Sequence, residues 1–254
     1  MNEIAAVILT LNEERNILDC IDSVRWSDRV VVVDTESSDD TVRLARSAGA
    51  EVIVHHFEDY SQIRNAALER VDSPWLFFVD ADERASPELA AEIRQVTAER
   101  PENGWWVPRH NYIFGQLTLG AGWYPDYQMR LLRRGTARYE RPVHEIVVLD
   151  GEEGHLENPL RHNNYDSVDQ FHAKQARYSD YDAEILFQDG VRPHFYTPVI
   201  QPLRHFFWRF LVLGGYRDGI HGLHLSALTA WYEGVKYHKL GRLWSVEKAG
   251  QQAN

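Results

Sequence analysis

The sequence predicts an α/β protein in which a mainly parallel, Rossmann-like sheet carries helices on both faces and a helical extension follows. Apolar runs that suit strands alternate, over about the first 80 residues, with segments whose apolar residues recur at helical spacing. The runs are uninterrupted and do not alternate with polar residues, which is typical of strands buried on both faces. After about Asn164 the pattern is helical.

The elements are expected in a regular order along the chain. Strands are expected at residues 4–9, 29–33, 51–55 and 75–79, with helices at 17–24, 41–48 and 62–70. The first two strands and their intervening helix form a β-α-β unit, which pairs the strands in parallel. From Gly104 onward, short aromatic-rich segments predict further strands of mixed orientation that extend the sheet.

Composition narrows the classes of function. The 254 residues carry a formal net charge of -11, which argues against a general nucleic-acid binder. A single cysteine, Cys20, fits a reducing cytosol. The N-terminus lacks the features of a signal peptide, and no stretch of about 20 apolar residues predicts a membrane span. We expect a cytoplasmic protein.

The most informative segment is the apolar run from Trp75 to Val79, which ends in Asp80, Asp82 and Glu83. Carboxylates at this point must meet solvent or a cation, because a buried strand cannot hold unpaired charge. Oxygen ligands suit Mg²⁺ or Mn²⁺, and such a cation can also bind a diphosphate. The alternative is an acidic turn before a helix that Ser86 caps.

Polar residues follow other strands of the predicted sheet, and ligands of such sheets bind at the carboxyl ends of the strands. Neither a Gly-x-Gly-x-x-Gly nor a Walker-type motif is present, so metal and an arginine such as Arg64 would have to meet any phosphate charge. The residues expected to converge are Thr10, Leu11, Asn12, Glu13, Asp34, Thr35, Glu36, Asp80 and Asp82.

Several of these segments together resemble the glycosyltransferase family 2 enzymes of the GT-A fold, and in particular the branch of lipopolysaccharide inner-core β-1,4-glucosyltransferases. The similarity covers roughly residues 4 to 165. One departure is Glu36, where relatives commonly carry glycine. The matching segments are Ile8–Glu14, Val32–Thr41, Ile63–Asn65, Phe78–Glu83, Pro125–Leu131 and Pro142–Glu145.

The resemblance implies roles for the donor-binding residues. Leu11 and Glu13 match positions that line the base pocket, Asp34 matches an acid that contacts uracil, and Arg64 helps to hold the nucleotide together with Asp80. Each has a structural alternative: Asp34 as a cap of the following turn, Glu13 as a first-turn helix acid, and Arg64 as a salt-bridge partner.

The chemistry implied by the resemblance needs a metal and a base. Asp80 and Asp82 would hold Mn²⁺ or Mg²⁺ at the leaving diphosphate, with His162 as a third ligand, although a surface histidine is the alternative. Glu145 is the candidate base that deprotonates the acceptor hydroxyl, with His144 beside it. A salt bridge to Arg141 or Arg161 is the alternative for Glu145.

The C-terminal part contains an amphipathic segment. On a helix from Gln201 to Gly214 the apolar residues cover one side, and Arg204, His205 and Arg209 lie on the other. This pattern is typical of a helix at a membrane interface and suits a lipid-linked acceptor at an anionic membrane surface. Packing against the catalytic domain is the alternative.

We therefore expect a metal-dependent inverting glycosyltransferase that moves a hexose, glucose by the resemblance, from a UDP-sugar to a lipid-linked glycan such as inner-core heptose. It would be peripheral on the cytoplasmic face of the inner membrane. The expected domains are a GT-A catalytic domain over 1–165, with halves 1–100 and 101–165, and a helical extension over 166–254. Alternatives are a polyprenyl-phosphate or other cell-envelope glycosyltransferase and a sugar nucleotidyltransferase.

Overall fold

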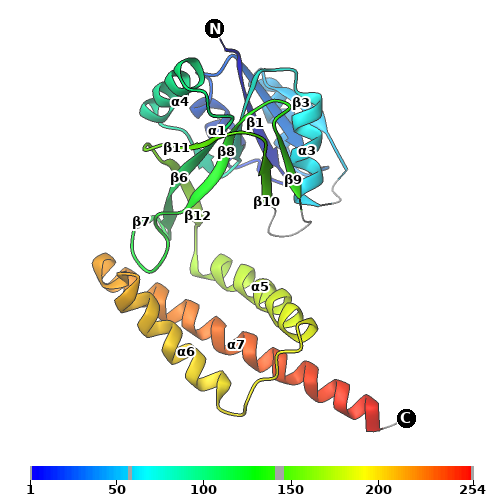
Figure 1. Ribbon diagram of the computed structural model, residues 1–254, viewed down its shortest axis with the longest axis vertical. Coiled ribbons are helices and arrows are strands. Elements are labelled where there is room, and N and C mark those ends of the chain that lie inside the picture. Colours follow the sequence, from blue (N-terminus) through cyan, green and yellow to red (C-terminus); the bar gives the residue numbers. More distant parts are fainter. Residues whose placement is uncertain (1, 57–58, 141–145, 253–254) are drawn as a thin grey trace. The chain divides into compact units, whose positions relative to one another are not determined.

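The computed structural model describes residues 2–56, 59–140 and 146–252 and divides into two compact units (Figure 1). The first unit comprises Met1–His110 and Asp126–Asn163, and the second comprises Asn111–Pro125 and Asn164–Asn254. The expected boundary after residue 165 lies close to the start of the long second segment. The short segment 111–125, expected in the catalytic domain, groups instead with the C-terminal helices.

The first unit is built on a mixed sheet with strand order β3-β2-β1-β4-β8-β6-β12-β5. Strands β1 to β4 are parallel, and β8 joins β4 and β6 in antiparallel orientation. A separate antiparallel pair is formed by β9 (Ala137–Glu140) and β10 (Ile146–Leu149). The other strands are β1 (Ile4–Thr10), β2 (Arg29–Asp34), β3 (Glu51–Val54), β4 (Trp75–Asp80), β5 (Glu83–Arg84), β6 (Gly104–Ile113), β7 (Gln116–Thr118), β8 (Tyr127–Arg133), β11 (Glu153–His155) and β12 (Leu160–Tyr165).

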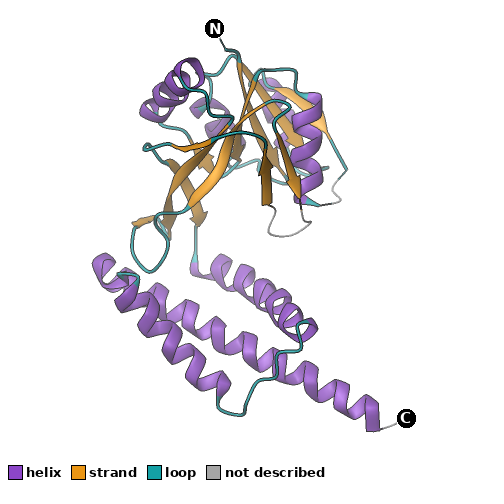
Figure 2. Ribbon diagram, viewed as in Figure 1, coloured by secondary structure: helices purple, strands orange, loops and turns teal. Residues whose placement is uncertain are grey.

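Helices cover both faces of this sheet, as the uninterrupted apolar strands predict. Alternate residues of β1 enter two different cores: Ile4 and Ile8 join one, and Ala5 and Val7 join the other. The first core includes residues of α1 (Ile17–Ser23) and α4 (Pro87–Glu99), whereas α3 (Tyr60–Arg70) contributes to the second (Figure 2). Helix α2 spans Thr41–Ser47.

Helix α4 begins where the sequence predicts. Ser86 accepts a hydrogen bond from the backbone N–H of Leu89 with its hydroxyl, and Pro87 occupies the first turn. The acidic turn before a capped helix is therefore real. It does not exclude a ligand site, because the carboxylates of Asp80 and Asp82 precede the cap.

The second unit is mainly helical, although the short strand β7 also belongs to it. It contains α5 (Val168–Gln188), α6 (Thr197–Phe207), a π-helical turn at Trp208–Val212, a 3₁₀ turn at Gly215–Asp218 and α7 (Gly219–Gln252). Helix α7 packs between α5 and α6 (Figure 2). A Cβ atom at Gly222 would lie 1.9 Å from the carbonyl oxygen of Gly215, so the tight return into α7 requires glycine. Among the described helices, none is both long and apolar enough to cross a membrane.

Candidate active site

The carboxyl ends of β1, β2 and β4 meet at one edge of the sheet, as expected from the sequence. Thr10 is in register with Asp34, and Leu9 is in register with Asp80. The loops after β1 and β2 are tied together, because the backbone N–H of Asn12 donates to Ser37 Oγ at 2.8 Å and that of Glu13 donates to Thr41 Oγ1 at 2.8 Å. The expected donor-side residues of these loops therefore converge.

Asp34 orders these loops. Its buried carboxylate accepts hydrogen bonds from the hydroxyl of Thr10 at 2.9 Å, the hydroxyl of Ser37 at 2.5 Å and the backbone N–H of Ser37 at 2.8 Å. Asp34 therefore caps the turn that follows β2, which is the alternative that the sequence left open for this residue. A direct contact of Asp34 with a nucleotide stays a prediction.

The other donor-side residues are placed differently. Leu11 is half exposed, which leaves an apolar surface at the edge of the sheet, while Glu13 Oε2 accepts a hydrogen bond from Asn16 Nδ2 at 2.7 Å. Glu36 has a positive φ of 64°, a conformation that glycine adopts without strain. Glycine, which the resemblance leads us to expect at this position, would adopt this backbone conformation without steric cost.

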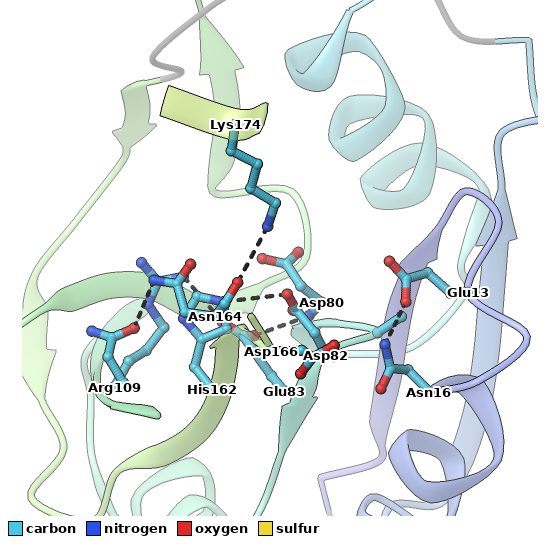
Figure 3. Close-up of polar contacts among 12 residues, drawn as sticks. Glu13, Asn16, Asp80, Asp82, Glu83, Arg109, His162, Asn164, Asp166 and Lys174 are labelled. Carbon is cyan, nitrogen blue, oxygen red and sulfur yellow. Dashed lines mark hydrogen bonds and ion pairs between the residues drawn. The ribbon is translucent and has the colours of Figure 1, made fainter. Parts of the chain in front are cut away.

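Asp80 lies in a group of arginines (Figure 3 shows it beside Asp82 and Glu83). Its carboxylate accepts from Arg64 Nη2 at 3.3 Å and from both terminal nitrogens of Arg130. Burial opposes ionisation of Asp80, but Arg130 and Arg64 outweigh it and hold the pKa of the carboxyl well below its usual range. Asp80 is thus an anion with cations already beside it.

Glu83 joins the two sides of this arginine group. Its side chain is fully buried, and Oε1 accepts from Arg130 Nη2 at 2.7 Å and from Arg109 Nη1 at 3.2 Å. The other oxygen accepts the backbone N–H of Asp80 at 2.9 Å, which fixes the turn after β4. Arg109 also donates to Asp126 Oδ2 at 2.9 Å.

Sequence reasoning gave no role to Arg130, Arg109 or Asp126. Arg130 and Asp126 fall in the matching segment Pro125–Leu131, which was the available signal. An arginine between the apolar residues Met129 and Leu131 of a strand is a further signal, because such a charge is buried only when it is paired. Its partner, 50 residues away in sequence, cannot be read from spacing.

Asp82 and His162 lie together at the candidate metal position. The distance from Asp82 Oδ2 to His162 Nε2 is 3.4 Å; His162 is buried, and the side chain of Asp82 is partly accessible. Strand pairing holds them there, because His162 is in register with Glu83 and the backbone N–H of Asn163 donates to Asp82 O at 3.0 Å. The structure therefore brings together two of the three expected ligands, while the carboxylate of Asp80 contacts the arginines.

This pair fits a divalent cation that also binds a diphosphate. Within the residues that the structure describes, no three His, Cys, Asp or Glu side chains form a metal cluster. Mg²⁺ in particular is commonly held by one or two protein ligands together with substrate phosphates and water. Asp82 and His162 are suitable donors for such a site, and substrate oxygens would complete the coordination.

A cavity of about 480 Å³ adjoins the arginine group. Asn65 supports its wall, because the side-chain amide of Asn65 donates to Tyr139 O and accepts from Tyr139 N, each at 2.8 Å. Glu145 and His144 lie outside the described residues, but Ile146, which follows Glu145 in the sequence, lines the cavity. The lining residues are Arg64, Trp106, Gln128, Met129, Arg130, Tyr139, Ile146 and Val147.

Replacing Arg130 by Met is expected to destabilise the fold by about 3–5 kcal/mol, because Asp80 and Glu83 would lose their shared buried partner. Urea unfolding measures the change. Arg134→Met is the matched control: Arg134 pairs at the surface with Asp72, so its loss should cost about 1 kcal/mol or less. Equal effects of the two substitutions would contradict the buried network.

The pH dependence of the unfolding free energy, compared between wild type and Arg130→Met, provides a second test. The pKa of Asp80 is lowered in the folded state, so its ionised form contributes stability above its unfolded pKa. That contribution decreases as the pH falls below the ordinary carboxyl range. The stability difference between wild type and Arg130→Met should therefore shrink in acid, whereas a difference that is constant with pH would exclude the ionic origin.

Comparison with known proteins agrees with this geometry. The family model described as glycosyl transferase family 2 matches residues 5–117. The lipopolysaccharide core biosynthesis glycosyltransferase LpsC of Rhizobium meliloti is 31% identical over 89% of this chain and 87% of its own length. An uncharacterized glycosyltransferase of Rickettsia felis is 27% identical over 94% of this chain and 90% of its own.

The likeness extends to solved structures. Glucosyl-3-phosphoglycerate synthase from Mycobacterium tuberculosis, crystallised with Mn²⁺, uridine diphosphate and phosphoglyceric acid, aligns with a TM-score of 0.50. The alignment covers 76% of this chain and 80% of that one at 19% identity. At this identity the likeness concerns the fold, a mixed GT-A sheet with helices on both faces.

Proposed function

This chain belongs to glycosyl transferase family 2, and we propose that it transfers a hexose, with inversion, from a UDP-sugar to a lipid-linked glycan. Glucose is the donor sugar and inner-core heptose of lipopolysaccharide the acceptor in this proposal. The observation that carries it is the similarity to LpsC, whose name places it in lipopolysaccharide core biosynthesis and which matches nearly the whole chain.

The donor is proposed to bind at the edge of the sheet where β1, β2 and β4 end. The half-exposed Leu11 and the neighbouring Glu13 would contact the base, and Asp34 would hold their loop and contact uracil. Arg64 and Arg130 line the cavity and contact Asp80, so an incoming diphosphate would meet two cations already neutralised in part by one carboxylate.

Asp82 and His162 are the proposed protein ligands of Mn²⁺ or Mg²⁺, with Asp80 beside them. When bound, the cation would stabilise negative charge on the leaving diphosphate. Within the chain itself, Glu83 and Arg130 keep Asp80 in place, and Arg84 fixes the turn by donating to the carbonyl oxygens of Ala81 and Glu83 at 2.7 and 2.8 Å.

Glu145 is the proposed base. Its neighbour Ile146 lines the cavity, and a base must lie within hydrogen-bond reach of the acceptor hydroxyl that attacks the sugar. An acceptor that is lipid-linked would require the protein to work at the cytoplasmic face of the inner membrane as a peripheral protein.

A UDP-release assay over several UDP-sugars, with and without Mn²⁺ or Mg²⁺, tests the donor part of the proposal. We expect release from UDP-glucose in the presence of metal and an appropriate acceptor. Mass analysis of lipopolysaccharide from a deletion strain should show a core that lacks one hexose. An unchanged core together with release from no UDP-sugar would overturn the proposal.

A further inference from the structure

One face of helix α6 is apolar and exposed in the helical unit. The residues on it are each more than half exposed, and they recur three to four positions apart, as residues on one face of a helix do. They are Val199, Ile200, Leu203 and Phe207, and Leu211 in the π-helical turn after α6 extends the exposed apolar surface. The opposite face packs on α7, where Pro202 lies against Gly234. A continuous apolar face of this kind marks an interaction surface, unlike single exposed apolar residues.

Arg209, expected from the sequence to belong to a basic face with Arg204 and His205, is engaged inside the helical unit. Its Nη1 donates to Ala121 O at 2.6 Å, its Nε donates to His205 Nε2 at 2.8 Å, and its guanidinium lies over the ring of Trp123. Burial lowers the pKa values of both Arg209 and His205. Arg209 is therefore a structural residue, and other basic residues would have to bind an anionic ligand.

The C-terminal segment is nevertheless cationic. Residues 190–254 contain eight lysine and arginine residues and three acidic ones, whereas residues 1–189 contain 19 basic and 35 acidic side chains. A chain of net charge -11 thus ends in a segment of formal charge +5. Such an asymmetry favours an anionic partner for this segment and not for the rest of the chain.

A cavity of about 300 Å³ lies at the beginning of α6. His194, His238 and Arg242 line it together with the hydroxyl-bearing Ser245, and none of the described residues around it is acidic. Phe195 and Pro198 complete the side toward Val199, the first residue of the exposed apolar face. The cavity and the face are therefore adjacent along the chain.

We propose that this cavity and the apolar face of α6 together bind an anionic phospholipid of a bilayer. The phosphate is held by Arg242, His194 and His238, which offer nitrogen donors around a space without a competing carboxylate. The apolar face, with Leu203 and Phe207 at its centre, lies in the acyl boundary. The attraction of basic residues to an anionic leaflet adds to this apolar contact.

The inference deepens the proposed function, because it names the surface at which a lipid-linked acceptor would be met and rests on that function for its purpose. It does not depend on the donor. Vesicle binding can be measured without any nucleotide, and UDP release can be measured with a soluble acceptor analogue. Failure of one is therefore distinguishable from failure of the other.

The test is flotation of the full chain with vesicles of phosphatidylcholine alone and of phosphatidylcholine mixed with phosphatidylglycerol. We expect binding to the mixed vesicles only. Arg242→Glu should weaken it roughly tenfold or more, whereas Arg177→Glu, an exposed charge reversal on α5, should change it little. An equal loss of vesicle binding in both variants would indicate bulk charge attraction and would overturn the proposal that the cavity binds the phosphate.

The apolar face is tested with a double variant of its own and a matched control on α5. Leu203→Ser with Phe207→Ser should weaken binding roughly tenfold or more, while Tyr181→Ser with Ile185→Ser, equally spaced and exposed on α5, should not. Circular dichroism and UDP release should be normal in all variants. If inorganic phosphate at matched ionic strength displaces the protein completely and the α6 variant still binds, the cavity takes free phosphate and the bilayer assignment is wrong.

Discussion

Glu145→Gln is expected to lower turnover by roughly 10²-fold or more with little change in donor affinity. Glutamine keeps the size and hydrogen-bonding capacity of the side chain but cannot accept the proton of the acceptor hydroxyl. The effect should therefore appear in the chemical step and not in the binding of UDP-sugar. Initial rates at saturating donor with a soluble acceptor analogue measure the first quantity, and calorimetry with UDP measures the second.

Glu140→Gln is the appropriate control, because Glu140 is an exposed glutamate on β9 whose partner is Arg138. Its turnover should be within about twofold of the wild type, since surface pairs contribute little. Near-normal transfer by Glu145→Gln would move the base to another group, with His144→Ala tested next. A loss of donor affinity equal to the loss of turnover would indicate a positioning role for Glu145.

The fold of the first unit was predictable because the residue composition of its strands shows that both faces of the sheet are covered. Ile4 and Ala5 are both buried and lie on opposite faces of the sheet. A strand that is covered on both faces needs apolar residues at every position, which produces an uninterrupted apolar run. The convergence of the loops after β1, β2 and β4 then follows from parallel pairing, and the register of Thr10 with Asp34 confirms it.

The arginine group could not be predicted in the same way. Arg130 and Glu83 are 47 residues apart, and their contact depends on where β8 enters the sheet. The periodicity of apolar residues within a segment gives no information on that position. The same limit applies to Arg209. Helical spacing predicted that Arg204, His205 and Arg209 share one basic face, but the structure leaves Arg204 exposed and half-buries His205 and Arg209. Arg209 packs on residues 120–123, which are distant in the sequence.

Asp82→Ala is expected to remove the metal-dependent part of UDP affinity, a loss of roughly 10²-fold or more, while the fold stays intact. The side chain is partly accessible, and its contact is with His162, so its removal leaves no buried charge behind. Calorimetry with UDP, in the presence and absence of Mn²⁺, measures the affinity. Asp150→Ala, which removes an exposed carboxylate elsewhere in the first unit, should bind as the wild type does.

His162→Ala separates two readings of the pair. If His162 is a metal ligand, the variant should lose Mn²⁺-dependent affinity in the same direction as Asp82→Ala, and the double substitution should cost less than the sum of the two. If only Asp82→Ala loses it, the imidazole serves as a hydrogen-bond partner that orients the carboxylate. Unchanged affinity and full turnover in folded Asp82→Ala would remove the acidic turn after β4 from the metal site, because Asp80 alone is already held by arginines.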